Sequence, residues 1–96
     1  MHPIIQLLHD NLPRLKAKYP LHSLAIFGSY SRGDQNPNSD LDVLYEAMPN
    51  TFLDLYNYID LKQDLTELTK LKIDLVNKKF INPIVWLKAK NDVIYV

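Results

Sequence analysis

The sequence predicts an α/β fold: a small mixed β-sheet with helices packed on it. Apolar residues recur at helical spacing in three segments, and short apolar or alternating runs lie between them. The order along the chain is helix, strand, turn, strand, helix, strand, helix, strand. Such mixing of helices and strands is typical of a sheet covered by helices. The chain has 96 residues, which is room for one core, so we expect a single domain over residues 1–96.

The composition excludes several classes of protein. Eleven basic and eleven acidic residues cancel, so no excess of positive charge points to a nucleic-acid partner. The absence of cysteine excludes disulfides and thiolate metal sites. Every apolar run is too short to cross a bilayer, and the start, Met1 to Ile4, lacks the basic and apolar regions of a signal peptide. We therefore expect a cytoplasmic protein without a membrane partner.

Three segments have helical patterns. The first runs from Pro3 to Lys18, with a kink or restart expected near Asp10 because Pro13 lacks an N–H group. The second begins at a capping pattern, Thr51-x-x-Asp54, and runs to about Lys70. Its expected apolar stripe contains Phe52, Leu55, Tyr58, Ile59, Leu61, Leu65 and Leu68. The third helix is expected from Ile84 to about Lys90, after Asn82 as N-cap and Pro83 as first residue.

Four short segments have strand patterns. Residues 24–27 are all apolar, which is typical of a central strand buried on both faces. Residues 40–46 alternate, so that Leu41, Val43 and Tyr45 face one way and Asp40 and Asp42 the other. Residues 72–76 alternate in the same manner, and residues 93–96 form a last short strand. These strands complete the expected sheet.

Both glycines of the chain lie in one connection, at positions 28 and 33. Glycine permits a positive φ or a close approach of the backbone to a ligand. Gly28 ends the apolar run, and Ser29 follows with a hydroxyl and with backbone N–H groups that suit a phosphate. Arg32 would add a charge-assisted contact to that phosphate, with a solvent-exposed role as the equal alternative. We interpret the connection as a phosphate-binding turn.

Three carboxylates complete the expected site. Asp40 and Asp42 are two residues apart in a strand, so they project side by side from one face. Asp74 lies in another short strand, and the three acids converge if the two strands are neighbours. Carboxylates are the ligands that Mg²⁺ prefers, and two such ions among them would clamp an in-line displacement at phosphorus. Each feature alone is common in turns and at strand ends, but the three together in this order indicate a site.

These residues resemble a known signature. Gly28-Ser29, then Asp40-x-Asp42 and a later strand aspartate, Asp74, look like the motif of the DNA polymerase β-like nucleotidyltransferases. The longer stretch from Phe27 to Asp42 resembles their minimal members, the MNT or MntA group. The resemblance covers essentially the whole chain, and its only departure is Ser31, where a small residue such as alanine is usual. It implies a core like the palm of DNA polymerase β.

The resemblance also implies roles for these residues. Gly28 and Ser29 would hold the triphosphate of ATP, while Asp40, Asp42 and Asp74 would bind two Mg²⁺ ions. Asp74 would also help to activate the acceptor hydroxyl. The implied reaction moves AMP from ATP to a hydroxyl group, with pyrophosphate as the leaving group.

The acceptor remains open between three hypotheses. Little of the chain is left for an acceptor pocket, which favours a protein that brings its own docking surface. In the resembling group this is a tyrosine of a HEPN-type toxin, and the enzyme is the antitoxin of a type VII toxin–antitoxin pair. The alternatives are a small-molecule acceptor, for which a homodimer could build the pocket, and an antitoxin that neutralises its toxin by binding without catalysis. The presence of all three acids, Gly28 and Ser29 argues against the last.

Overall fold

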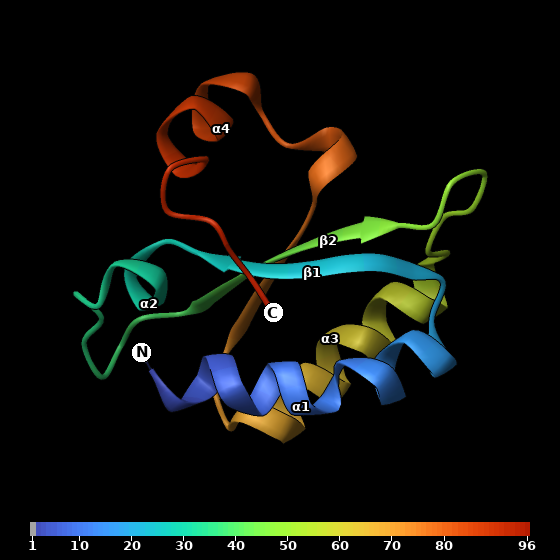
Figure 1. Ribbon diagram of the computed structural model, residues 1–96, viewed down its shortest axis with the longest axis horizontal. Coiled ribbons are helices and arrows are strands. Elements are labelled where there is room, and N and C mark those ends of the chain that lie inside the picture. Colours follow the sequence, from blue (N-terminus) through green and yellow to red (C-terminus); the bar gives the residue numbers. More distant parts are fainter. Residues whose placement is uncertain (1) are drawn as a thin grey trace.

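The fold is described from a computed structural model that covers residues 2–96 (Figure 1). Its strands are β1 (Leu21–Phe27), β2 (Leu41–Ala47), β3 (Ile73–Asn77) and β4 (Ile94–Tyr95). Its helices are α1 (Pro3–Lys18), α2 (Ser29–Arg32), α3 (Leu55–Thr69) and α4 (Pro83–Ala89), with a 3₁₀ turn, η1 (Lys78–Phe80). The predicted order of helices and strands is confirmed.

The four strands form one mixed sheet in the order β3-β2-β1-β4. β1 pairs antiparallel with both β2 and β4, whereas β2 and β3 are parallel. A parallel neighbour requires a crossover connection, and α3 provides it between β2 and β3. The sheet therefore brings together the C-terminal end of β1 and the N-terminal ends of β2 and β3. The predicted site residues lie at this end of the strands.

Helices cover both faces of the sheet. α1 and α3 lie on one side and α4 on the other (Figure 1). The larger core, on the α1 and α3 side, contains alternate residues of the strands, among them Ile26, Val43 and Ile73. The smaller core, on the α4 side, contains Ala25, Phe27, Leu44 and Ala89. β1 is thus buried on both faces, as its apolar run predicts.

α1 departs from the prediction at its proline. The helix runs from Pro3 to Lys18 with Pro13 inside it, so a restart near Asp10 is wrong, while a kink there stays a prediction. The apolar side chains before and after the proline pack into the same core, for example Leu8 and Leu15. Tertiary packing therefore keeps one helix where the local sequence alone favours two.

α3 starts later than predicted. Its N-cap is Asp54, whose carboxylate accepts a hydrogen bond from Asn57 N at 2.8 Å, and the helix begins at Leu55. The expected apolar stripe is correct from Tyr58 onward, except at Ile59. Tyr58 packs against the larger core, and Leu61 and Leu65 are fully buried. In the first part the large apolar side chains are exposed, namely Phe52, Leu55, Tyr56 and Ile59. The core thus takes up α3 from Tyr58 onward and leaves its first turn exposed.

No helix within residues 2–96 is long and apolar enough to cross a membrane.

Candidate active site

The turn between β1 and α2 depends on Gly28. Its φ of +74° and ψ of −151° lie in a region that is essentially restricted to glycine. The Gly28 carbonyl accepts hydrogen bonds from the N–H groups of Ser31 and Arg32, both at 3.1 Å, and from Ser31 Oγ at 2.8 Å. These bonds close the first turn of α2 and leave the N–H groups of Ser29 and Tyr30 without a partner inside the helix.

Two further contacts hold this turn in place. The ring of Tyr30 is buried and meets the ring of His2 edge to face, with 5.2 Å between centroids. Gly33 ends α2 in the left-handed conformation with φ of +83°, and its N–H donates to Ser29 O at 2.9 Å. The short helix is therefore fixed at both ends, and its start faces the site.

Asp42 lies directly beside this turn. In the antiparallel pair of β1 and β2, Asp42 is the partner of Phe27, the residue before Gly28. A Cβ atom added to Gly28 would overlap Asp42 Oδ2. Glycine at position 28 thus serves two purposes: it permits the backbone conformation and it leaves room for the carboxylate.

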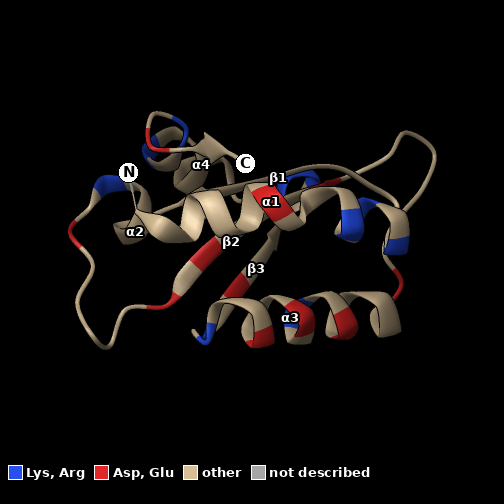
Figure 2. Ribbon diagram, turned by 60° about the horizontal axis from the view of Figure 1, so that its bottom comes forward, with Lys and Arg blue, Asp and Glu red and all other residues tan. Residues whose placement is uncertain are grey.

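Asp74 is the neighbour of Asp42 on the other side. β2 and β3 pair with Asp42 opposite Asp74, so both side chains point to the same face on adjacent strands. Figure 2 shows the acidic positions of β2 and β3 side by side. β3 is the edge strand of the sheet and Asp74 is exposed, while Asp42 is partly buried. The structure therefore shows that the two strands are neighbours, which is the condition under which the sequence predicts that these two acids meet.

The environment of Asp42 favours its neutral form. Burial raises the pKa of the Asp42 carboxyl from 3.8 to about 6, assisted by the charge of Asp74, by hydrogen bonding between the two carboxyls and by the charge of Asp40. Arg32 acts in the opposite direction and lowers this pKa. A carboxyl surrounded by other acids in this manner is suited to bind a cation, which would relieve the repulsion.

A pocket of about 510 Å³ opens between the turn, the start of β2 and α4. Four of the predicted residues besides Asp42 line it: Gly28, Ser29, Arg32 and Asp40. The rest of the lining is Phe27, Asn38, Ser39, Val85, Lys88 and Ala89. Asp74 does not line the pocket and is the neighbour of Asp42 on β3. The structure thus gathers five of the six predicted residues around one cavity.

Arg32 lines the pocket, but its guanidinium already forms ion pairs with two acids. Its Nε donates to Asp34 Oδ2 at 3.1 Å, and its Nη1 lies 3.5 Å from Asp92 Oδ2. Asp92 belongs to the connection between α4 and β4, far along the chain. Any contact of Arg32 with a phosphate therefore has to compete with these two ion pairs.

The carboxylates fit magnesium by donor type. Mg²⁺ commonly takes one or two carboxylates and completes its octahedron with water and substrate phosphates. Among residues 2–96, no three His, Cys, Asp or Glu side chains are grouped closely enough to hold a metal ion by themselves. Asp40 and Asp42 therefore supply only part of a metal site, and the phosphates of a nucleotide would have to supply the rest.

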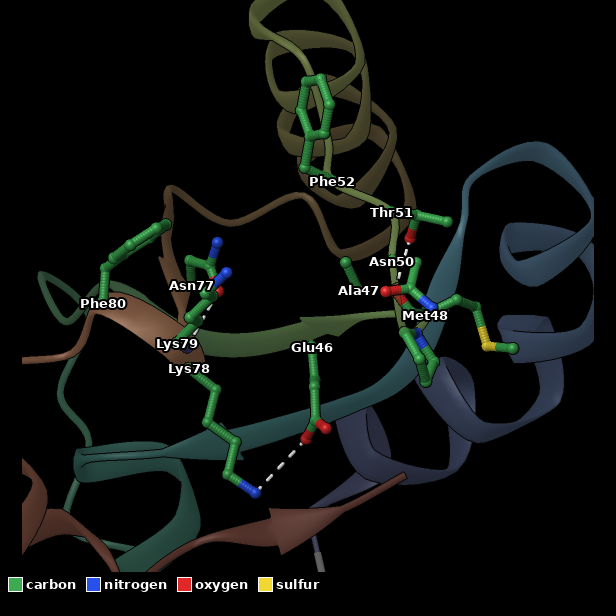
Figure 3. Close-up of a pocket in the computed structure, with 11 residues that line it drawn as sticks. Glu46, Ala47, Met48, Asn50, Thr51, Phe52, Asn77, Lys78, Lys79 and Phe80 are labelled. Atoms are coloured by element: carbon green, nitrogen blue, oxygen red, sulfur yellow. Dashed lines mark hydrogen bonds and ion pairs between the residues drawn. The ribbon is translucent and has the colours of Figure 1, made fainter.

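A second cavity, of about 440 Å³, lies at the other end of β2 and β3 (Figure 3). Phe52 from the β2–α3 connection and Phe80 from η1 contribute to its walls. Its one acid, Glu46, is paired with Lys78 at 3.4 Å. This cavity lacks the paired aspartates and the glycine turn, so the first pocket is the candidate active site.

Comparison with known proteins agrees with this geometry. A family profile for the nucleotidyltransferase domain matches residues 11–96. This chain belongs to the nucleotidyltransferase family. The protein adenylyltransferase MntA of Thermococcus cleftensis is 30% identical over 95 residues, which cover 97% of this nucleotidyltransferase and 92% of the relative. MJ1379 of Methanocaldococcus jannaschii, provisionally named a protein adenylyltransferase, is 39% identical over 94 residues, which are 97% and 94% of the two chains.

The MntA protein of Shewanella oneidensis is 39% identical to this nucleotidyltransferase over 74 residues. These residues are 77% of the present chain and 48% of the relative, which is therefore much longer. With the other two relatives, this match places the chain among the minimal, MntA-like nucleotidyltransferases, as the motif predicts.

Solved structures confirm the fold. A crystal structure of a toxin–antitoxin pair with AMP-PNP is similar with a TM-score of 0.64 and 29% identity, covering 96% of this chain and 68% of the other. A chain provisionally described as a minimal nucleotidyltransferase gives a TM-score of 0.71 at 22% identity, over 94% and 93% of the two chains. The predicted α/β fold with a mixed sheet is thus the minimal nucleotidyltransferase fold.

A third solved structure contains a tri-AMPylated HEPN toxin of Shewanella oneidensis in complex with its MNT antitoxin. It is similar with a TM-score of 0.58 and 26% identity, and the match covers 96% of this chain and 64% of that one.

The sequence alone does not identify the α4 side of the pocket. Val85, Lys88 and Ala89 line the cavity, although they follow the aspartates by more than 40 residues. Nothing in their spacing indicates a site, since a basic residue in the last turn of a helix is ordinary. Only the position of α4 over the sheet brings them to the pocket.

Proposed function

We propose that this nucleotidyltransferase moves AMP from ATP to a hydroxyl group of a protein partner. The observation that carries the proposal is the single pocket in which Gly28 and Ser29 face Asp40 and Asp42. The names of the relatives support it, since those proteins are called protein adenylyltransferases. The AMP-PNP in the similar toxin–antitoxin structure supports a nucleoside triphosphate as the donor.

The turn would hold the nucleotide. The N–H groups of Ser29 and Tyr30 and the hydroxyl of Ser29 are hydrogen-bond donors for phosphate oxygens at the start of α2. Gly28 lets these groups approach the phosphates because it has no side chain there. Holding the α-phosphate against the strand ends is the positioning that catalysis of phosphoryl transfer mainly requires.

Asp40 and Asp42 would bind Mg²⁺ together with the phosphates. The metal would supply positive charge to offset the negative charge that develops on the transferring phosphate. This arrangement explains why acids line a pocket for an anionic substrate. Without such a cation, carboxylates and phosphates would repel each other.

Asp74 would serve the acceptor. It is exposed on β3, an edge strand, next to Asp42 of the pocket lining, so a bulky partner could reach it. In the proposed step the acceptor oxygen attacks the α-phosphorus, and the bond from that phosphorus to the bridging oxygen breaks. Pyrophosphate leaves with the electron pair, and the hydroxyl proton passes to the Asp74 carboxylate.

We further propose that the partner is a HEPN-type toxin, that the acceptor is a tyrosine, and that this chain is the antitoxin. The proposal is supported by the complex of the AMPylated Shewanella oneidensis HEPN toxin with its MNT antitoxin. Pairing of this kind would make the chain half of a type VII toxin–antitoxin pair.

The test is transfer of label from ATP to the product of the neighbouring gene, which we expect to be a HEPN-type protein. We expect the partner to become labelled in the presence of Mg²⁺, and D40N/D42N to abolish the labelling. D10N/D60N is the matched control, because it also removes two negative charges but at exposed positions away from the pocket. An unlabelled partner that the D40N/D42N protein still neutralises would instead support an antitoxin that acts by binding.

A further inference from the structure

Lys88 stands on the wall of the active-site pocket opposite the glycine turn. It lies in the last turn of α4 and lines the pocket together with Val85 and Ala89. Ala89 is buried against the sheet in the same small core as Phe27 and Leu44. The backbone that carries Lys88 is therefore fixed relative to the site, while its side chain is exposed and free to reach a ligand.

The two cations that line the pocket differ in whether a carboxylate neutralises their charge. Its lining contains two acids, Asp40 and Asp42, and two cations, Arg32 and Lys88. The guanidinium of Arg32 is held by Asp34 and Asp92. Among residues 2–96, Lys88 takes part in none of the ion pairs. Lys88 is thus the lining cation whose charge no carboxylate of the described chain already neutralises.

Lys88 supplies positive charge at a place where the backbone alone would repel an anionic ligand. It lies at the C-terminal end of a helix, where exposed carbonyl groups carry partial negative charge that would repel a phosphate. A lysine placed there reverses the local sign. Lysine also binds phosphate as a compact charge on a flexible stem, so it can follow a phosphate chain without exact prior alignment.

We propose that Lys88 binds the terminal phosphates of the nucleotide, which become the pyrophosphate leaving group. The inference rests on the proposed function, since it assumes that a nucleoside triphosphate occupies this pocket. The turn at Gly28 and Ser29 and the lysine of α4 then hold the phosphate chain from two sides. Arg32 in turn serves mainly to tie α2 to the α4–β4 connection through Asp92.

The alternative is that Lys88 only stabilises the end of its helix. Binding measurements with a series of ligands separate the two roles. We would measure the affinities of ATP, ADP and AMP for the wild type and for K88A, K88R and K90A. Lys90 is the matched control, because it caps the same helix end but does not line the pocket.

We expect K88A to weaken ATP binding about tenfold, the effect of one charge-assisted contact. ADP should lose less and AMP should be unaffected, because the lost contact is to the terminal phosphates. K88R should retain most of the ATP affinity, and K90A should match the wild type. A thermal melt of each variant checks that all are folded, and K88Q repeats the test should K88A melt early.

Two results would overturn the assignment of Lys88. The first is a K88A or K88Q protein that binds ATP as tightly as the wild type. The second is an equal loss for AMP and ATP, which would indicate a general change of the pocket. A wild-type protein that binds none of the three nucleotides would overturn the proposed function itself, and the role of Lys88 with it.

Discussion

The carboxylate of Asp42 occupies the space that a side chain at position 28 would fill. Gly28 lies in the turn after β1 and Asp42 lies in β2, yet a Cβ atom at Gly28 would overlap Asp42 Oδ2. The glycine turn and the acidic start of β2 are therefore in direct contact. Movement of either element would displace the other.

G28A should damage both stability and nucleotide binding. Alanine would be strained at the backbone angles of Gly28, at a cost of about 1–3 kcal/mol, and would push Asp42 aside. The matched control is G33A, since Gly33 also has a positive φ but nothing lies within 4 Å of an added Cβ. Chemical denaturation and ATP titration of both variants test this. Equal losses of ATP affinity in the two variants would contradict the coupling.

The pKa of Asp42 gives a second prediction. Because folding raises this pKa from 3.8 to about 6, the folded state binds the proton more tightly than the unfolded state. In the absence of metal, the Asp42 contribution to stability is therefore present below about pH 4 and is lost as the pH rises through about 6. An NMR titration of the carboxyl carbons should show Asp42 near 6, and D74N should lower that value. A midpoint near 3.8 in the wild type would refute this.

Metal and nucleotide should stabilise the protein together. Mg²⁺ relieves the repulsion among the acids, and ATP completes its coordination, so each ligand should strengthen binding of the other. At about 100 times the dissociation constant, a ligand adds about 2.7 kcal/mol, which raises the melting temperature of a chain this size by roughly 10–20 °C. Thermal melts with Mg²⁺, ATP and both should show the largest shift for the pair. D40N/D42N should abolish the extra shift.

Stability away from the site should depend on the link between α1 and α3. The hydroxyl of Tyr19, a buried residue, donates to Asp64 Oδ2 at 2.6 Å, and Lys18 Nζ approaches the same oxygen at 2.8 Å. Y19F should cost about 1 kcal/mol, the usual net value of such a bond. K18A should change little, since its ion pair is exposed. Urea denaturation compares the two, and a larger loss for K18A would show that the ion pair dominates.

Much of the fold follows from local sequence patterns. The alternation of residues 40–46 correctly assigns Leu41 and Val43 to one face and Asp42 to the other, because one side of β2 faces the larger core. The continuous apolar run before Gly28 correctly predicts a strand covered on both sides. The sequence predicts these features because the burial of each side chain alone determines them.

Other features depend on tertiary arrangement. An apolar pattern does not say whether its residues meet the core, and the exposed Phe52, Leu55 and Ile59 continue the same stripe as the buried Leu61. The pairing of Asp42 with Asp74 requires the parallel register of β2 and β3. The sequence predicts that both acids lie in strands, but it does not show that these two strands are neighbours.

The interactions of charged residues were the least predictable part of the site. Arg32 meets Asp92 from a segment 60 residues away. Lys88 reaches the pocket only because Ala89 packs on the face of the sheet that α4 covers. Long side chains at exposed positions carry no periodic signal, so their partners emerge only from the folded chain.

The most direct test of nucleotidyl transfer is to follow the two ends of the triphosphate separately. The wild type would be incubated with Mg²⁺, its HEPN-type partner and ATP labelled at either the α- or the γ-phosphate. Attack at the α-phosphorus predicts that the α label is attached to the partner and that the γ label is released as pyrophosphate. The γ label on the partner would show phosphoryl transfer instead and would contradict the account of this site.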